Sequence, residues 1–176
     1  MTTSSILRKL KGGDRRSIGR SNEVVTQVLA RPELFGVLFA GLSVDDPIVR
    51  ARAADAVEKI STIHPEYLRP CKAALLGELA RCEQKEVRGH VAQMLPRLRW
   101  TTGEQQRVYD ILSEYLRDSS SIVKTFAMQA LADLTTQAPE RRPAVLRQLK
   151  TLTAHGTPAM RARGRTLLAD LLRDSP

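Results

Sequence analysis

The sequence feature that most constrains the fold is a pattern that recurs four times at a nearly constant period. Each copy opens with an apolar residue followed by a basic one, and the spacings between openings are 38, 36 and 37 residues. The residues 4, 7, 8 and 11 positions after each opening residue are apolar, apart from one glycine. This spacing is typical of one face of an α-helix, so the pattern predicts four amphipathic helices with one buried stripe each. We call these positions the apolar ladder: Val49, Ala53, Ala56, Val57, Ile60; Val87, Val91, Met94, Leu95, Leu98; Val123, Ala127, Ala130, Leu131, Leu134; Met160, Gly164, Leu167, Leu168, Leu171.

Between the ladder helices lie segments that predict a first helix for each helix pair. Pro65 and Pro139 stand where a first helical turn tolerates proline, and each is followed by an acidic residue, which the positive end of a helix favours. Polar residues before the ladder helices supply candidate caps. The predicted first helices cover 32–42, 65–80, 103–116 and 139–153.

A poorer copy of the pattern runs from Asp14 to Leu29, with Ile18, Val25 and Leu29 at ladder positions. It has no first helix, so we interpret it as a half-repeat that caps the N-terminal end of the array. The predicted organisation is a basic, disordered arm over 1–13 and a single repeat domain over 14–176. Its predicted parts are the half-repeat 14–30 and the repeats 31–63, 64–100, 101–137 and 138–176.

The start of the first ladder helix resembles the HEAT-repeat family, whose second helices open with an Asp-Pro-x-Val-Arg run. Asp46-Pro47-Ile48-Val49-Arg50 matches that run well, and the later copies match it in part. The resemblance covers 14–173. It implies an all-α, right-handed α-solenoid of about four HEAT-like helix pairs with an N-terminal capping helix. It also implies a chain that holds another macromolecule, without saying which one.

The net charge of +9 is concentrated at the two ends of the sequence. Residues 1–20 and residues 139–176 each carry +5, whereas 21–138 carry −1. Because the body is neutral, a uniform nucleic-acid-binding face is not expected. The basic ends can still contact phosphates, and the candidate residues are Arg8, Lys9, Lys11, Arg15, Arg16, Arg161 and Arg165.

Two further features bear on the compartment. Cys71 and Cys82 are eleven residues apart in one predicted helix, about 16 Å, which exceeds the ~7 Å Cα limit of a disulfide. Reduced thiols and a cytoplasmic location follow, and no segment approaches the ~20 apolar residues of a membrane span. The acid-free, basic start of the chain up to Lys11 also resembles a mitochondrial transit peptide, which is an alternative to a binding arm.

In HEAT pairs the second helices line the concave face, so the resemblance places the binding surface beside the apolar ladder. Residues 3, 6 and 10 positions after each opening residue would lie there, and they mix bases, acids, amides and the aromatic Phe126. We call them the polar row. The candidate partner-binding residues among them are Arg52, Lys59, His90, Gln93, Arg97, Phe126, Gln129 and Arg163.

No spacing in the sequence is typical of catalysis, a cofactor or a metal site, and the three histidines lack metal-ligand spacing. The function predicted is therefore non-enzymatic protein binding by a monomeric scaffold without cofactors. The alternative is nucleic-acid binding through the basic N-terminal arm and the C-terminal Arg-rich helix. A third reading is similarity to the HEAT-like DNA glycosylases for alkylated bases, in which Trp100 and Asp133 would take the roles of the concave aromatic and the aspartate.

The last ladder helix carries one apolar residue more than the earlier ones. Leu172 corresponds to Ser61, Arg99 and Thr135 in the preceding copies. We expect Leu172 to pack back on the predicted helix 139–153, since a single exposed leucine is no interaction patch. Exposure of Leu172 would instead indicate self-association or docking of a partner.

Overall fold

The computed structural model describes residues 4–14 and 17–173, and every element of secondary structure in these ranges is helical. The all-α class predicted from the sequence is confirmed. The chain divides into two compact units, Met1–Leu98 and Arg99–Pro176. The single domain over 14–176 stays a prediction. Among the described helices, none is long and apolar enough to cross a membrane.

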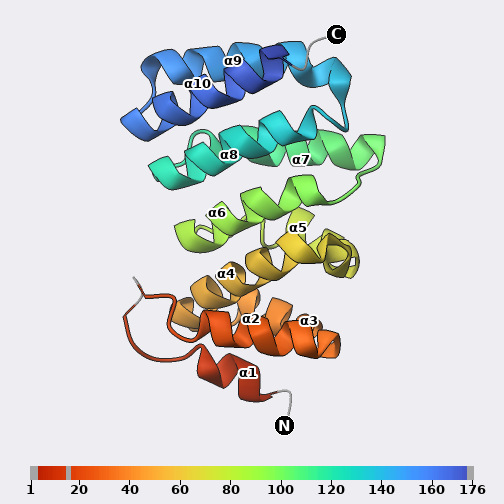
Figure 1. Ribbon diagram of the computed structural model, residues 1–176, viewed down its shortest axis with the longest axis vertical. Helices are drawn as coiled ribbons and strands as arrows, with labels where there is room; N and C mark the ends of the chain where they lie inside the picture. The colour runs from red at the N-terminus through yellow and green to blue at the C-terminus, as the bar shows by residue number, and fades with distance from the viewer. Residues whose placement is uncertain (1–3, 15–16, 174–176) are drawn as a thin grey trace. The chain divides into compact units, whose positions relative to one another are not determined.

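The first unit is built around its longest helix, α4, which contacts α2, α3 and α6 (Figure 1). Short 3-10 segments join several of the helices. The helices are α1 (Ser4–Lys9), α2 (Ser21–Ala30), α3 (Phe35–Ala40), α4 (Pro47–Ile63), α5 (Lys72–Leu76) and α6 (Lys85–Met94), and the 3-10 segments are η1 (Pro32–Leu34), η2 (Gly41–Ser43), η3 (Pro65–Cys71) and η4 (Leu95–Arg97).

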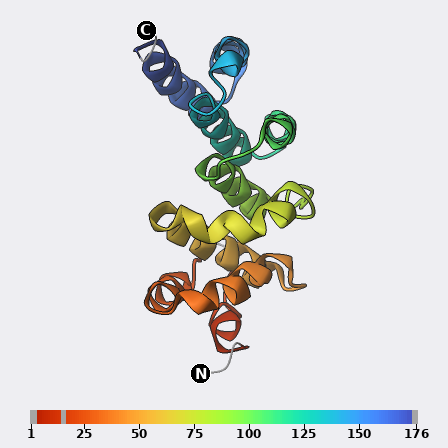
Figure 2. The same ribbon diagram turned by 90° about the vertical axis from the view of Figure 1, so that its right-hand side faces the viewer.

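The described part of the second unit contains the α-helices α7 to α10. Helix α10 packs against both α9 and α8, and α7 packs against α8, as two views of the ribbon show (Figure 1 and Figure 2). Its elements are α7 (Thr102–Tyr115), α8 (Ser121–Leu134), η5 (Pro139–Arg141), α9 (Arg142–His155) and α10 (Pro158–Arg173).

The apolar ladder contributes to the core of both units, together with apolar residues of the other helices. Every ladder residue is buried except Leu168, which is half-buried. The predicted ladder helices correspond to α4, α6, α8 and α10, although α6 changes to the 3-10 segment η4 after Met94. Leu95 and Leu98 remain buried beyond that change. The periodicity therefore identified the buried face correctly, because apolar burial is what that pattern records.

Side-chain caps satisfy backbone donors at the starts of α4 and α7. The Asp46 carboxylate accepts hydrogen bonds from the backbone N–H groups of Ile48 and Val49, at 2.9 and 3.3 Å. This satisfies donors that the first turn of α4 would otherwise leave unpaired. Thr101 and Glu104 form a reciprocal capping box at the start of α7.

The predicted helix over 65–80 is wrong in its continuity. Residues 65–71 form a 3-10 helix with Pro70 inside it, and α5 ends at Leu76, before Gly77. A proline removes a backbone donor, which disfavours regular α-helix. We expected Cys71 and Cys82 to lie in one helix, and they do not. Both are free thiols. Burial raises the pKa of the Cys71 thiol to about 11.

The expected exposure pattern at the C-terminal end is also wrong. Leu172 is 56% exposed instead of packing on α9. Leu171, its neighbour in sequence, takes the buried position, and successive helix residues point about 100° apart. The extra leucine therefore lies at the solvent.

The N-terminal segment differs from the disordered arm that we expected. Residues 4–9 form α1, and Ile6 and Leu10 are buried. These two apolar side chains provide the burial that orders the segment. Within the half-repeat predicted for 14–30, α2 begins only at Ser21, and Ile18, which we placed on the ladder, is 46% exposed.

The buried guanidinium of Arg52 organises the chain between α1 and α2. It donates hydrogen bonds to the carbonyls of Leu10 (2.8 Å), Gly12 (2.6 Å), Asp14 (3.0 Å) and Ser17 (3.0 Å). Only 5% of Arg52 is exposed. A buried charge is tolerated where its donors are satisfied, and here backbone carbonyls satisfy them.

Gly19 lets the chain pass close to this guanidinium. Its φ of +52° is in the left-handed region, and a Cβ at this position would lie 2.6 Å from Cζ of Arg52. Both the backbone conformation and the close approach therefore require glycine. The connection between α1 and α2 is thus shaped around one arginine side chain of α4.

We expect Arg52→Met to lower the free energy of unfolding by about 2–4 kcal/mol, because several charge-assisted hydrogen bonds are lost. The segment 11–20 should become sensitive to proteases at a temperature where the core remains folded. Chemical denaturation and limited proteolysis measure the two effects. Arg69→Met, at an exposed position of η3, is the control, and equal losses in the two variants would contradict the role of Arg52.

Candidate functional site

The polar row of the first unit begins with a correction. Arg52 was expected to face a partner, but it is buried and its guanidinium is used by the carbonyls between α1 and α2. The Arg52 side chain can turn inward because the glycine-containing connection between α1 and α2 supplies backbone carbonyls as acceptors. Arg52 is therefore a structural residue and leaves the set of candidate binding residues.

Lys59 and Asp55 connect α4 to α2. The Lys59 ammonium lies 2.7 Å from the Asp55 carboxylate and donates to the side-chain carbonyl of Asn22 at 2.8 Å. Ser21, at the start of α2, donates its hydroxyl to the same Asp55 carboxylate at 2.5 Å. Both charges are thus matched inside the unit, and this part of the polar row holds two helices together.

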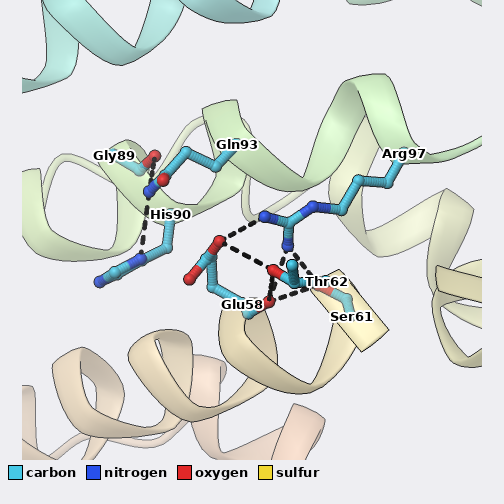
Figure 3. Close-up of polar contacts among 7 residues, drawn as sticks. All are labelled: Glu58, Ser61, Thr62, Gly89, His90, Gln93 and Arg97. Atoms are coloured by element: carbon cyan, nitrogen blue, oxygen red, sulfur yellow. Dashed lines mark hydrogen bonds and ion pairs between the residues drawn. The ribbon is translucent and has the colours of Figure 1, made fainter. Parts of the chain in front are cut away.

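Arg97 continues the same arrangement between η4 and α4. Figure 3 shows its guanidinium directed at the end of α4, where it forms an ion pair with the Glu58 carboxylate. It also donates to the Glu58 carbonyl and to the Ser61 hydroxyl, each at 2.7 Å. The side chains of Arg97 and Glu58 are 21% and 15% exposed, so water screens this pair only in part.

His90 lies beside this cluster on α6, next to Gln93 (Figure 3). The Gln93 amide is 3.4 Å from the His90 Nδ1 and also donates to the Gly89 carbonyl at 3.4 Å. Burial lowers the pKa of His90 below its usual 6.5, while the carboxylates of Asp55 and Glu58 act in the opposite direction. Neutral imidazole is the form that this environment favours.

The polar row of the second unit is more open. The Gln129 side chain donates to the Asp133 carboxylate at 2.8 Å, and its carbonyl accepts from the Arg163 guanidinium at 3.1 Å. Asp133 and Arg163 are exposed, and Gln129 is half-buried. Phe126, three residues before Gln129 on α8, is also half-buried. This surface combines a cation, an amide, an anion and an aromatic ring.

The candidate phosphate contacts fall into three groups. Lys9 is already paired with the Glu23 carboxylate at 2.5 Å. Hydrogen bonds from Arg20 and, to a smaller extent, from Lys9 lower the pKa of Glu23 to about 2. Arg8, Arg161 and Arg165 are exposed, as is Lys11. Arg15 and Arg16 lie outside the described residues.

Arg8 and Lys11 line an open groove of about 410 Å³ at the start of α4. Asp45 and Asp46 line the same groove. Acidic side chains beside the two cations reduce the attraction for a phosphate. The groove is therefore electrostatically mixed.

Trp100 does not offer the aromatic surface that base recognition requires. It is 6% exposed, and its backbone carbonyl accepts a hydrogen bond from the Gln105 side chain at 3.3 Å. The expectation that Trp100 and Asp133 could act as in a DNA glycosylase is wrong for Trp100, since a buried indole cannot stack on a flipped base. The indole is buried instead of being offered to a ligand.

Sequence reasoning missed Glu58 and Ser61, which contact Arg97. They lie 9 and 12 positions after Val49, outside the offsets assigned to the polar row. A usable signal existed, because the bonded polar pairs are about one repeat apart. Their separations are 34 residues for Ser21–Asp55, Arg50–Gln84 and Gln129–Arg163, 37 for Asn22–Lys59 and 39 for Glu58–Arg97.

Within residues 4–14 and 17–173, no group of three or more His, Cys, Asp or Glu side chains could hold a metal ion. Comparison of the sequence with known protein families and with curated proteins found no match. The chemistry of the site therefore has to be inferred from its own side chains.

The lowered pKa of His90 predicts a pH effect on stability. The unfolded chain binds a proton at the usual pKa near 6.5 and the folded chain only at lower pH, so stability should fall as the pH drops below about 6.5. Urea unfolding at pH 7.5 and pH 5.5 measures this loss. His90→Gln should have a smaller loss over that interval, and an unchanged pH dependence in this variant would contradict the assignment.

Proposed function

We propose that this chain is a non-enzymatic scaffold that binds another protein, built as a right-handed α-solenoid of about four HEAT-like helix pairs with an N-terminal capping helix. The partner would be held on the concave face, along the polar row of the second unit. Four ladder helices at a nearly constant period support the solenoid, since stacking is how such pairs bury their apolar faces. A monomer acting in the cytoplasm is part of this proposal.

The observation that carries the proposal is the exposed chain of hydrogen bonds from Asp133 through Gln129 to Arg163, beside Phe126. A half-buried aromatic ring next to polar groups of both signs is the composition of a protein–protein interface. The hydrogen bonds fix these side chains before binding, which reduces the conformational entropy that a partner must remove.

The same surface is a poor match for nucleic acid. Backbone phosphates select surfaces where cations are present without nearby acids, because binding is driven by the release of counterions. Here Asp133 lies in the same hydrogen-bonded chain as Arg163, and Arg173 is paired with Asp170 at 3.2 Å. The mixed charges therefore favour a protein partner.

Nucleic-acid binding by the basic ends remains the second candidate. The exposure of Arg8, Lys11, Arg161 and Arg165 favours it, because these guanidinium and ammonium groups are accessible to phosphates. A gel shift with random duplex DNA tests this candidate. No shift at low salt, or no weakening after deletion of residues 1–13, would remove it.

We expect affinity capture from a nuclease-treated lysate to retain a protein partner at about 200 mM salt, since mixed interfaces depend less on salt than phosphate contacts do. Arg163→Glu should weaken that capture by about tenfold or more, because a rigid interface charge is reversed. Arg147→Glu is the control, with the same charge change at an exposed position of α9 that belongs to neither the polar row nor the other candidate contacts. Capture that disappears with nuclease, or equal effects of the two variants, would contradict the proposal.

A further inference from the structure

One side of α10 is largely exposed, whereas the matching positions of the earlier ladder helices are buried or half-buried, apart from the exposed Arg99. We call it the outer flank and define it by Arg161, Arg165, Leu168 and Leu172, which lie 1, 5, 8 and 12 positions after Met160. At the position of Arg165 the earlier copies have Ala54, Ala92 and Met128, all 0% exposed. At the position of Leu168 they have Val57, Leu95 and Leu131, of which none exceeds 1% exposure.

The second unit shows what normally covers this side. A Cβ on Gly164 of α10 would lie 3.2 Å from Cε of Met128. Met128 lies 5 positions after Val123, and Gly164 lies 4 positions after Met160. Met128, the counterpart of Arg165, is therefore covered by the next ladder helix. The outer flank of α10 is the surface that would receive a helix in this way.

The first unit shows how the basic residue at the start of a ladder helix is used. Arg50, the equivalent of Arg161, donates to the Gln84 side chain at 2.8 Å. Gln84 is the N-cap residue of α6, and its amide donates back to the Pro47 carbonyl at 2.8 Å. A polar N-cap residue on the following helix is thus the natural partner of the base.

On α10 both cations of the outer flank lack such partners. The guanidinium groups of Arg161 and Arg165 make no hydrogen bond or ion pair with any residue in the described part of the chain. Leu172, 56% exposed, and the half-buried Leu168 lie on the same side of the helix. The flank therefore offers two accessible positive charges together with two leucines.

We propose that the outer flank of α10 binds an amphipathic helix of another protein, with an acidic N-cap residue and a second acidic residue seven positions later. The N-cap acid would meet Arg161 as Gln84 meets Arg50. The incoming helix would contact α10 as α10 contacts α8. On α10, Gly164, which faces Met128, lies seven positions after Thr157, the residue before the helix. A second acid seven positions after the N-cap would therefore meet Arg165, the counterpart of Met128. Apolar side chains of the incoming helix would cover Leu168 and Leu172.

The charges select this occupant over a second copy of the chain. A two-fold symmetric contact through the flank would place the four arginines of two copies on one small surface without adding an acid, and like charges oppose association. Nucleic acid would match the arginines but would leave the leucines uncovered. An acidic amphipathic helix satisfies both kinds of side chain.

A fluorescent peptide tests the proposal with the full-length protein. The probe is a helical peptide of about 15 residues with leucines along one face, Asp at its N-cap and Glu seven positions later, and its control has Lys at both positions. Fluorescence anisotropy at low salt should show binding of the acidic peptide and at least about tenfold weaker binding of the Lys peptide.

Matched variants locate the binding. Arg165→Glu should weaken the acidic peptide by about tenfold, and Leu172→Ser should also weaken it, whereas Arg163→Glu, on the other side of α10, should leave its affinity unchanged. Circular dichroism confirms that each variant is folded, which is expected because all three residues are exposed. Because Arg163 belongs to the polar row, unchanged peptide affinity in Arg163→Glu would show that the peptide does not bind at the surface of the proposed function. Failure of one proposal is thus distinguishable from failure of the other.

Several results would overturn the proposal. Equal binding of the two peptides, or an equal loss in Arg163→Glu, would show that the contact is not on the outer flank. A wild-type dimer that Leu172→Ser converts to a monomer in sedimentation would assign the flank to a second copy. Binding of duplex DNA that depends on Arg165, without binding of the acidic peptide, would assign it to phosphates.

Discussion

Burial of the apolar ladder is the constraint on which the rest of the structure depends. Its residues are small or aliphatic, and they let neighbouring helices approach closely in both units. Gly164 is the clearest case, because a Cβ there would lie 3.0 Å from Cβ of Thr153 on α9 and 3.2 Å from Cε of Met128 on α8. Only glycine allows α10 to contact both helices at this point.

Once the ladder is buried, the polar side chains beside it become the links between neighbouring helices. In the first unit Asp55 and Lys59 connect α4 with α2, and Arg97 connects η4 with Glu58 of α4. Such pairs replace contacts with water by contacts with the protein, so each adds little net stability but fixes the register of the helices. The two surfaces that we propose for a partner lie elsewhere, around Phe126 and Arg163 in the second unit and on the outer flank of α10.

The fold was predictable from the sequence where periodic burial decides it. Apolar spacing predicted the ladder positions. Apolar spacing and helix caps together predicted the helices α7 to α10 of the second unit. The exposed Leu172 could not be placed, because the pattern shows that the stripe widens but not whether a neighbour covers it.

The N-terminal region and the polar contacts were beyond the same reasoning. Arg52 has the spacing of a surface residue, yet it is buried because the carbonyls between α1 and α2 surround it. That environment depends on a chain reversal about 40 residues away in sequence, at glycines with positive φ. The spacing of apolar residues predicts which apolar side chains are buried. It does not predict the burial of a charged side chain whose hydrogen bonds are made with backbone carbonyls.

The most direct measurement is the melting temperature of two variants of α8 that differ only in the side of the helix they change. Ala127→Glu places a carboxylate on the apolar ladder, where it is buried without a partner, and should lower the melting temperature by on the order of 10 °C or prevent folding. Gln129→Glu, two residues later on the polar row, should change it by only about 2–3 °C, since surface substitutions have small effects. Similar losses in both variants would contradict a helix with one buried ladder and one surface available to a partner.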